Sequence, residues 1–84
     1  MSKQEALEIL YRSAGWTTPD AVCRQLRKFH HRSSVYSYLF RLHKQGLLHR
    51  QTIYGQIAYQ ISQRGIERLR FLKVREERKP EGAL

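Results

Sequence analysis

The apolar positions of this chain recur at helical spacing in four stretches of the sequence. Side chains at i, i+3, i+4 and i+7 share one face of a helix, so the pattern predicts helices over about residues 2–13, 18–28, 33–45 and 62–79. Ile57, Tyr59 and Ile61 alternate with other residues at a period of two, which predicts a strand over 57–61. A second strand over 47–53 and a turn over 54–56 complete an antiparallel hairpin. We therefore expect a mainly α fold with a small β-hairpin, in the order helix-helix-helix-strand-strand-helix.

Capping residues define the ends of these helices. Thr18-Pro19-Asp20 is a strong start signal, with the cap, a proline at the first helical position and an acid at the positive end of the dipole. Either Ser33 or Ser34 is expected to cap the third helix, and Gly46 to end it in the left-handed conformation. The other expected caps are Ser2, paired with Glu5 in a capping box, and Ser62. We expect one domain over residues 1–79, followed by a flexible tail over 80–84.

The second and third helices each have one apolar face. Val22, Leu26 and Phe29 form that face in the second helix, which is joined to the third by residues 30–32. In the third helix, Val35, Leu39 and Leu42 point inward. Its other face carries hydroxyls, aromatic rings and cations, with no acid: Tyr36, Ser37, Phe40, Arg41 and Lys44. A helix of this kind suits the major groove of DNA.

The charge of the chain favours a polyanionic partner. Lys and Arg number 16 against 7 Asp and Glu, which gives a net charge of +9. From Ala21 to Ile66 there is no acidic residue. The cations of that stretch are Arg24, Arg27, Lys28, Arg32, Arg41, Lys44, Arg50 and Arg64. A solvated basic surface with no partner is the alternative interpretation.

Several function classes lack support in the sequence. The single cysteine, Cys23, excludes an internal disulfide, and the histidines have no zinc-ligand spacing. No acid between Asp20 and Glu67 is available as a catalytic base, and no glycine loop could hold phosphates. We therefore expect no enzyme activity, metal or cofactor. Because there is no signal peptide and no apolar run of about 20 residues, we expect a cytoplasmic, nucleoid-associated protein with no membrane partner.

Two motifs carry a family resemblance. Val35-Tyr36-x-x-Leu39-x-Arg41-Leu42-x-x-x-Gly46-Leu47-Leu48 is similar to the recognition helix and first wing strand of PadR-like and MarR-like transcription regulators. Tyr59-x-Ile61-Ser62-x-x-Gly65 is similar to their second wing strand and the helix that follows. The resemblance covers about residues 3–75 and implies a winged helix-turn-helix fold. The chain departs from the PadR-like pattern in its uncharged wing tip, residues 51–56, and shows no evident small-molecule pocket.

The resemblance implies that helix 33–45 enters the major groove and that the wing, residues 47–61, contacts the DNA backbone. Arg41 and Lys44 are expected to contact bases or phosphates, and the serines of the same helix are expected to contact phosphates. For Phe40 three roles are open: contact with thymine methyl groups, core packing, or a protein contact. Tyr54 is either a backbone contact or an exposed hairpin aromatic. The DNA-binding candidates are Arg24, Arg27, Lys28, Arg32, Ser33, Ser34, Tyr36, Ser37, Phe40, Arg41, Lys44, Arg50 and Tyr54.

The last helix has two apolar sides. Ile66, Leu69 and Leu72 form a stripe that should dock on the domain, whereas Phe71 and Val74 lie on a different side. The resemblance implies that the terminal helices form a dimer, with an interface at Phe71, Val74 and Leu72. A helix end that is merely amphipathic is the alternative.

Three functions compete at this stage. The leading one is a homodimeric, sequence-specific double-stranded DNA-binding protein that represses transcription by occupying a promoter. A protein-interaction adaptor in a transcription or replication assembly is the second, because winged helices also serve as adaptors. Non-specific DNA packaging is the third.

Overall fold

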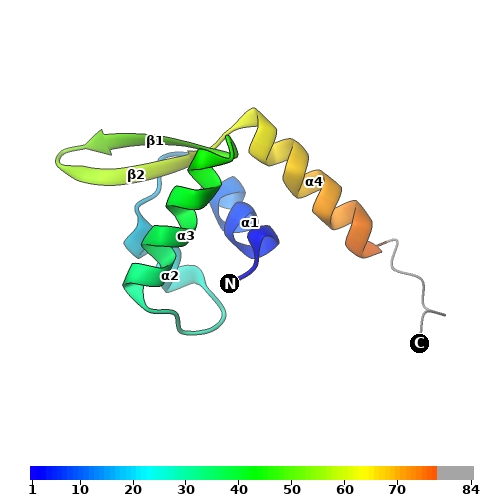
Figure 1. The fold of residues 1–84 in the computed structure, drawn as a ribbon, viewed down its shortest axis with the longest axis horizontal. Helices are drawn as coiled ribbons and strands as arrows, with labels where there is room; N and C mark the ends of the chain where they lie inside the picture. The colour runs from blue at the N-terminus through cyan, green and yellow to red at the C-terminus, as the bar shows by residue number, and fades with distance from the viewer. Residues whose placement is uncertain (78–84) are drawn as a thin grey trace.

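The computed structural model describes residues 1–77, which form four helices and a two-stranded antiparallel sheet (Figure 1). The helices are α1 (Lys3–Ser13), α2 (Pro19–Gln25), α3 (Arg32–Lys44) and α4 (Gln63–Glu77), and the strands are β1 (Leu48–Ile53) and β2 (Gln56–Ile61). The predicted mainly helical class, the hairpin and the order of elements are confirmed. The predicted end of the last helix at residue 79 and the tail over 80–84 lie outside the described residues.

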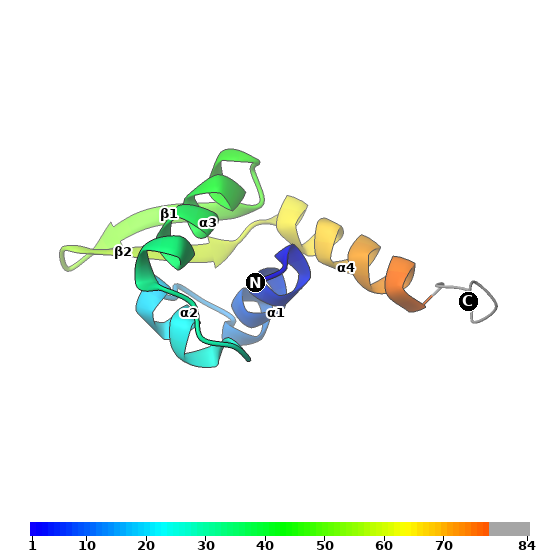
Figure 2. The same ribbon diagram turned by 60° about the horizontal axis from the view of Figure 1, so that its bottom comes forward.

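The core lies between α1, α2 and α3 and is closed by residues of the hairpin and α4. Most of the buried residues belong to the apolar faces that the periodic patterns predict. Residues in the hairpin and α4 complete the cluster at Leu48, Tyr59 and Leu69. Figures 1 and 2 show the hairpin projecting from this body on the side opposite to α4. The fully buried residues of the helices are Ala6, Leu7, Ile9, Leu10, Pro19, Val22, Val35, Leu39 and Leu42.

The hairpin pairs Leu48 with Ile61 at its base and Ile53 with Gln56 at its tip. Tyr54 and Gly55 connect the strands with φ values of 50° and 77°. Positive φ at both central residues is the pattern of a type I′ turn, whose twist matches that of the paired strands. Gln56 belongs to β2, so the turn is shorter than predicted. Thr17 exchanges two backbone hydrogen bonds of 2.8 and 2.9 Å with Tyr59, which fixes the α1–α2 connection to the hairpin.

Ser62 joins the end of α3 to the start of α4. Its hydroxyl accepts a hydrogen bond of 3.0 Å from the Gly65 N–H, which confirms the predicted cap, and donates one of 2.7 Å to the Gly46 carbonyl. Its backbone N–H donates to the Leu47 carbonyl at 3.0 Å. Gly46 has a φ of 81°, as expected for the residue that ends α3. The base of the hairpin and α4 are therefore held together by one buried serine.

The predicted extent of the second helix is wrong. α2 ends at Gln25, and Leu26 is extended at φ −71° and ψ 142°. The backbone N–H of Arg27 donates to the Glu5 carboxylate at 3.1 Å, so the donor that would continue the helix is satisfied by α1. Phe29, predicted on the buried face, is 85% exposed. The Glu5 N–H donates to the Ser2 hydroxyl at 3.0 Å, as the predicted cap requires, but the Glu5 carboxylate accepts from the Arg27 N–H and does not close a capping box.

The predicted serine cap of the third helix is also wrong. The cap residue of α3 is His31, which makes no side-chain capping bond. Ser33 and Ser34 lie inside the first turn, where the N–H of Ser34 donates to the His31 carbonyl at 3.0 Å. Neither hydroxyl therefore caps the helix.

Candidate nucleic-acid interface

The outward face of α3 is built as the sequence predicts. Val35, Leu39 and Leu42 are buried, and they leave the opposite side of the helix in solvent. Of the five residues predicted on that side, Tyr36 is half-buried and the rest are exposed: Ser37, Phe40, Arg41 and Lys44. In the described part of the chain, Arg41 and Lys44 form no salt bridge.

Phe40 lies in a cluster of cations and rings. Lys44 Nζ is 5.3 Å and Arg50 Cζ 5.8 Å from the centre of its ring, within cation–π range. The His43 ring lies 6.1 Å away. Phe40 is 42% exposed and is not part of the core, so the core-packing role considered for it is excluded. The cluster connects α3 with β1 through Arg50.

The first turns of α3 present a row of hydroxyls. Ser33, Ser34, Ser37 and Arg41 line a shallow hollow together with Met1, His30 and Tyr38. None of the three serine hydroxyls has a hydrogen-bond partner among residues 1–77. The first backbone N–H groups of a helix also lack intrahelical partners and carry partial positive charge. Hydroxyls, a guanidinium and a helix N-terminus therefore gather where an anionic oxygen could be bound.

Arg32 is already paired. Its Nε lies 2.9 Å from a carboxylate oxygen of Asp20, and its guanidinium donates to the Tyr36 hydroxyl at 3.0 Å. The hydrogen bond with Tyr36, followed by the charge of Asp20, raises the pKa of Arg32 above its ordinary value. Asp20 lies at the edge of the acid-free stretch, and the fold brings it next to a predicted phosphate ligand. Binding of a phosphate by Arg32 would compete with this carboxylate.

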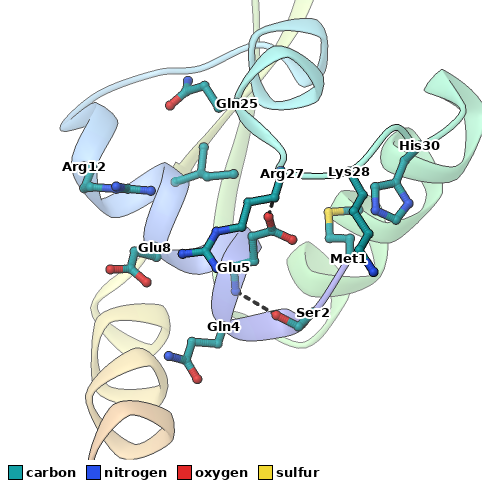
Figure 3. A pocket seen from close by; sticks show the side chains of 11 residues that line it. Met1, Ser2, Gln4, Glu5, Glu8, Arg12, Gln25, Arg27, Lys28 and His30 are labelled. Carbon is teal, nitrogen blue, oxygen red and sulfur yellow. Dashed lines mark hydrogen bonds between the residues drawn. The ribbon is translucent and has the colours of Figure 1, made fainter.

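Arg27 and Lys28 lie next to acids of α1. They line a hollow beside α1 together with Glu5 and Glu8, and Figure 3 shows both side chains directed into it. Met1 and His30 line both this hollow and the one at the first turns of α3, so the two hollows adjoin. Arg24 is exposed near the end of α2. Residues 21–66 contain no acid, but in the folded chain acids of α1 lie next to cations of this stretch.

The hairpin carries two of the predicted residues. Arg50 is exposed on β1, and Tyr54 at the tip is fully exposed. Sequence reasoning missed the part played by His43, whose Nδ1 lies 3.0 Å from the Leu48 carbonyl and whose ring lies 6.4 Å from that of Tyr59. His43 thus fixes the base of the hairpin against α3. In the sequence, the only indication of this role is that His43 lies on the flank of α3, one residue before Lys44.

Tyr38 lies on the flank of α3 next to Arg41. The Arg41 Cζ is 5.9 Å from the centre of the Tyr38 ring. Burial raises the pKa of the Tyr38 phenol, and the charge of Arg41 partly opposes this shift. The ring therefore acts as a neutral support for Arg41.

α4 divides its apolar residues between two sides, as predicted. Leu69 is buried, and Leu72, predicted both in the docking stripe and at the interface, is half-buried and packs against the core. Phe71 and Val74 are 55% and 46% exposed. Arg68 Cζ lies 5.9 Å from the Phe71 ring centre.

Two features of the described residues bear on other functions. Within residues 1–77, no group of three or more His, Cys, Asp or Glu side chains is close enough to hold a metal ion. None of the four described helices has the length and apolar character needed to cross a membrane.

Comparisons with protein-family models, with curated proteins and with solved structures find no match.

Proposed function

We propose that this protein binds double-stranded DNA in a sequence-specific manner, as a winged helix-turn-helix transcription regulator. The observation that carries the proposal is the outward face of α3. Within the described residues it combines three serine hydroxyls without partners and two cations that are free of salt bridges. Hydroxyls and cations bind phosphates and base edges, and the major groove is wide enough to admit a helix.

The proposed geometry uses each part of this surface differently. The N-terminal turn of α3 and Ser33 and Ser34 approach a phosphate, while Arg41 and Lys44 reach bases or further phosphates. The hairpin follows the backbone with Arg50 and Tyr54. Tyr36 supports Arg32 through their hydrogen bond, and Ser37 lies between the two groups of contacts.

We further propose that the protein acts as a dimer through the exposed side of α4. Two copies would place two α3 helices in successive major grooves, about 10 base pairs apart. A dimer bound in this way would occupy a promoter and so repress transcription.

Selection of bound duplexes from a random DNA pool at about 150 mM salt tests the proposal, since salt weakens the electrostatic binding that does not depend on sequence. We expect enrichment of a palindromic site with half-sites near one helical turn apart. If no sequence is enriched and binding is lost in salt, the proposal is wrong. Non-specific packaging or a protein partner would then explain the surface better.

Arg41→Ala tests α3 directly on the selected site. It should cost about 1–3 kcal/mol of binding free energy and relax the base preference at one position. Arg12→Ala is the matched control, because it removes the same charge from α1, on the hollow beside Glu8. Equal losses for the two variants, measured by fluorescence anisotropy, would show that only net charge matters and would remove Arg41 from base recognition.

A further inference from the structure

Phe40 is the one strongly apolar side chain among the exposed cations and hydroxyls of α3. At 3.6 residues per turn it lies more than about 120° from the middle of the stripe formed by Val35, Leu39 and Leu42. Its ring is therefore on the side of the helix that the proposed function directs into the major groove. Since it is outside the core, the fold alone does not require an aromatic residue there.

The ring is held in a fixed relation to both α3 and the hairpin. Lys44 approaches it from the next turn of the same helix, at 5.3 Å, and Arg50 from β1, at 5.8 Å. Any partner that covers Phe40 must also accept these two positive charges. A duplex meets this condition, because its phosphates lie on either side of the base edges. An apolar protein surface would instead desolvate both cations without a counter-charge.

A phenyl ring has no hydrogen-bond donor or acceptor. In the major groove the base edges present N7, O6, O4 and amino groups, and covering one of these with a ring would remove water without replacing its hydrogen bond. The apolar group in that groove is the C5-methyl of a pyrimidine. We propose that Phe40 contacts this methyl group and makes one position of the DNA site specific for a 5-methylpyrimidine, either thymine or 5-methylcytosine. The inference rests on the proposed function and names the chemistry that α3 recognises.

Removal of single methyl groups tests the contact. In the duplex enriched by selection, each dT is replaced in turn by dU, which differs by the methyl group alone, and Kd is measured for the wild-type protein and for Phe40→Ala. We expect one replacement to weaken wild-type binding about three- to fivefold, the equivalent of one buried methyl group. The same replacement should have no effect on Phe40→Ala.

A second comparison separates the two sources of the methyl group. The dT·dA pair at the sensitive position is replaced by a dC·dG pair, with and without a 5-methyl group on the cytosine. Tighter binding of the methylated duplex by the wild-type protein, and not by Phe40→Ala, would show that 5-methylcytosine is accepted. No difference would restrict the contact to thymine.

Two controls keep the result interpretable. Tyr54→Ala removes an exposed aromatic from the hairpin tip and should weaken binding by the same factor on the dT and dU duplexes. Thermal unfolding of Phe40→Ala should match that of the wild type, because the ring is not part of the core. If Phe40→Leu, which stays apolar, keeps sensitivity to the methyl group, the contact depends on apolarity.

The outcomes distinguish the inference from the proposed function. Enrichment of a site whose dU replacements affect the wild type and Phe40→Ala by equal factors would overturn the inference and leave DNA recognition intact. Failure to enrich any duplex would overturn both.

Discussion

Gly65 has no room for a side chain. A Cβ at this position would collide with the carbonyl oxygen of Leu47 and would lie 2.7 Å from Cγ1 of Ile61. The close approach lets Ser62 bond to both Gly46 and Gly65. Gly65→Ala should lower the free energy of unfolding by about 1–3 kcal/mol, the usual range for overpacking, as measured by urea denaturation.

Gly15 provides the control for that substitution. A Cβ there would lie 3.9 Å from the Ser13 carbonyl oxygen, an ordinary contact, and no positive φ is involved. Gly15→Ala should therefore not destabilise the protein. It should raise the free energy of unfolding by at most about 1 kcal/mol, because alanine restricts the unfolded chain. Equal losses for the two variants would contradict the steric explanation.

The serines show how far the sequence determines individual roles. Ser62 was predictable as a cap, because a capping hydroxyl bonds within its own turn. Its bond to the Gly46 carbonyl, 16 residues away, depends on the arrangement of α3 and α4 and has no local signal. Ser33 and Ser34 are residues of the type that caps helices, but the cap of α3 is His31, two residues before Ser33. Local preference thus identified the helix and not the use of each hydroxyl.

At the level of elements, the hairpin was predictable and the end of α2 was not. Period-two alternation and Gly55 specify two strands and a turn over residues 48–61. The pattern of Val22, Leu26 and Phe29 also satisfies helical spacing, but spacing does not show what each side chain packs against. The bond between the Arg27 N–H and Glu5 spans 22 residues and ends the helix early. Only the tertiary fold reveals such a competitor.

A substitution in the hairpin turn should raise the stability of the protein and weaken its binding to DNA. Tyr54 has a φ of 50°, a left-handed conformation that costs most residues roughly 1–2 kcal/mol, and asparagine tolerates it better. Tyr54→Asn should therefore raise the melting temperature. It should also weaken DNA binding, because the exposed ring is lost from the proposed wing contact.

Tyr11→Asn is the comparison for Tyr54→Asn. Tyr11 is an exposed tyrosine too, but it lies within α1, where asparagine relieves no strain. This variant should gain no stability and keep its affinity for DNA. If Tyr54→Asn were more stable and bound DNA as well as the wild type, Tyr54 would be only an exposed hairpin aromatic.

Across the whole molecule, the sequence predicted the sign of the charge better than its placement. All the predicted DNA-binding residues are exposed except Tyr36, which is half-buried. Yet Asp20 pairs with Arg32, and Glu5 and Glu8 share a hollow with Arg27 and Lys28. Acids from outside residues 21–66 lie next to cations of that stretch in the folded chain. The order of residues in the sequence does not show which charges become neighbours. In the part of the chain that the structure describes, Arg41, Lys44 and Arg50 on α3 and β1 are among the cations that form no salt bridge.

The exposed side of α4 gives the last prediction. A dimer formed through Phe71 and Val74 would bury apolar surface that the single chain leaves in solvent. Phe71→Ser should shift the protein toward the monomer in sedimentation equilibrium while leaving the fold intact, because Phe71 is outside the core. On DNA, the variant should lose affinity for the two-half-site duplex and keep its affinity for a single half-site.

Tyr11→Ser is the matched control, since Tyr11 is 50% exposed on α1 compared with 55% for Phe71. It should leave both the association state and the affinity for the two-half-site duplex unchanged. A wild-type protein that stays monomeric at concentrations well above its Kd for DNA, with Phe71→Ser binding both duplexes equally well, would contradict the dimer. Base recognition by α3 would survive that result, because each copy carries a complete outward face of the helix.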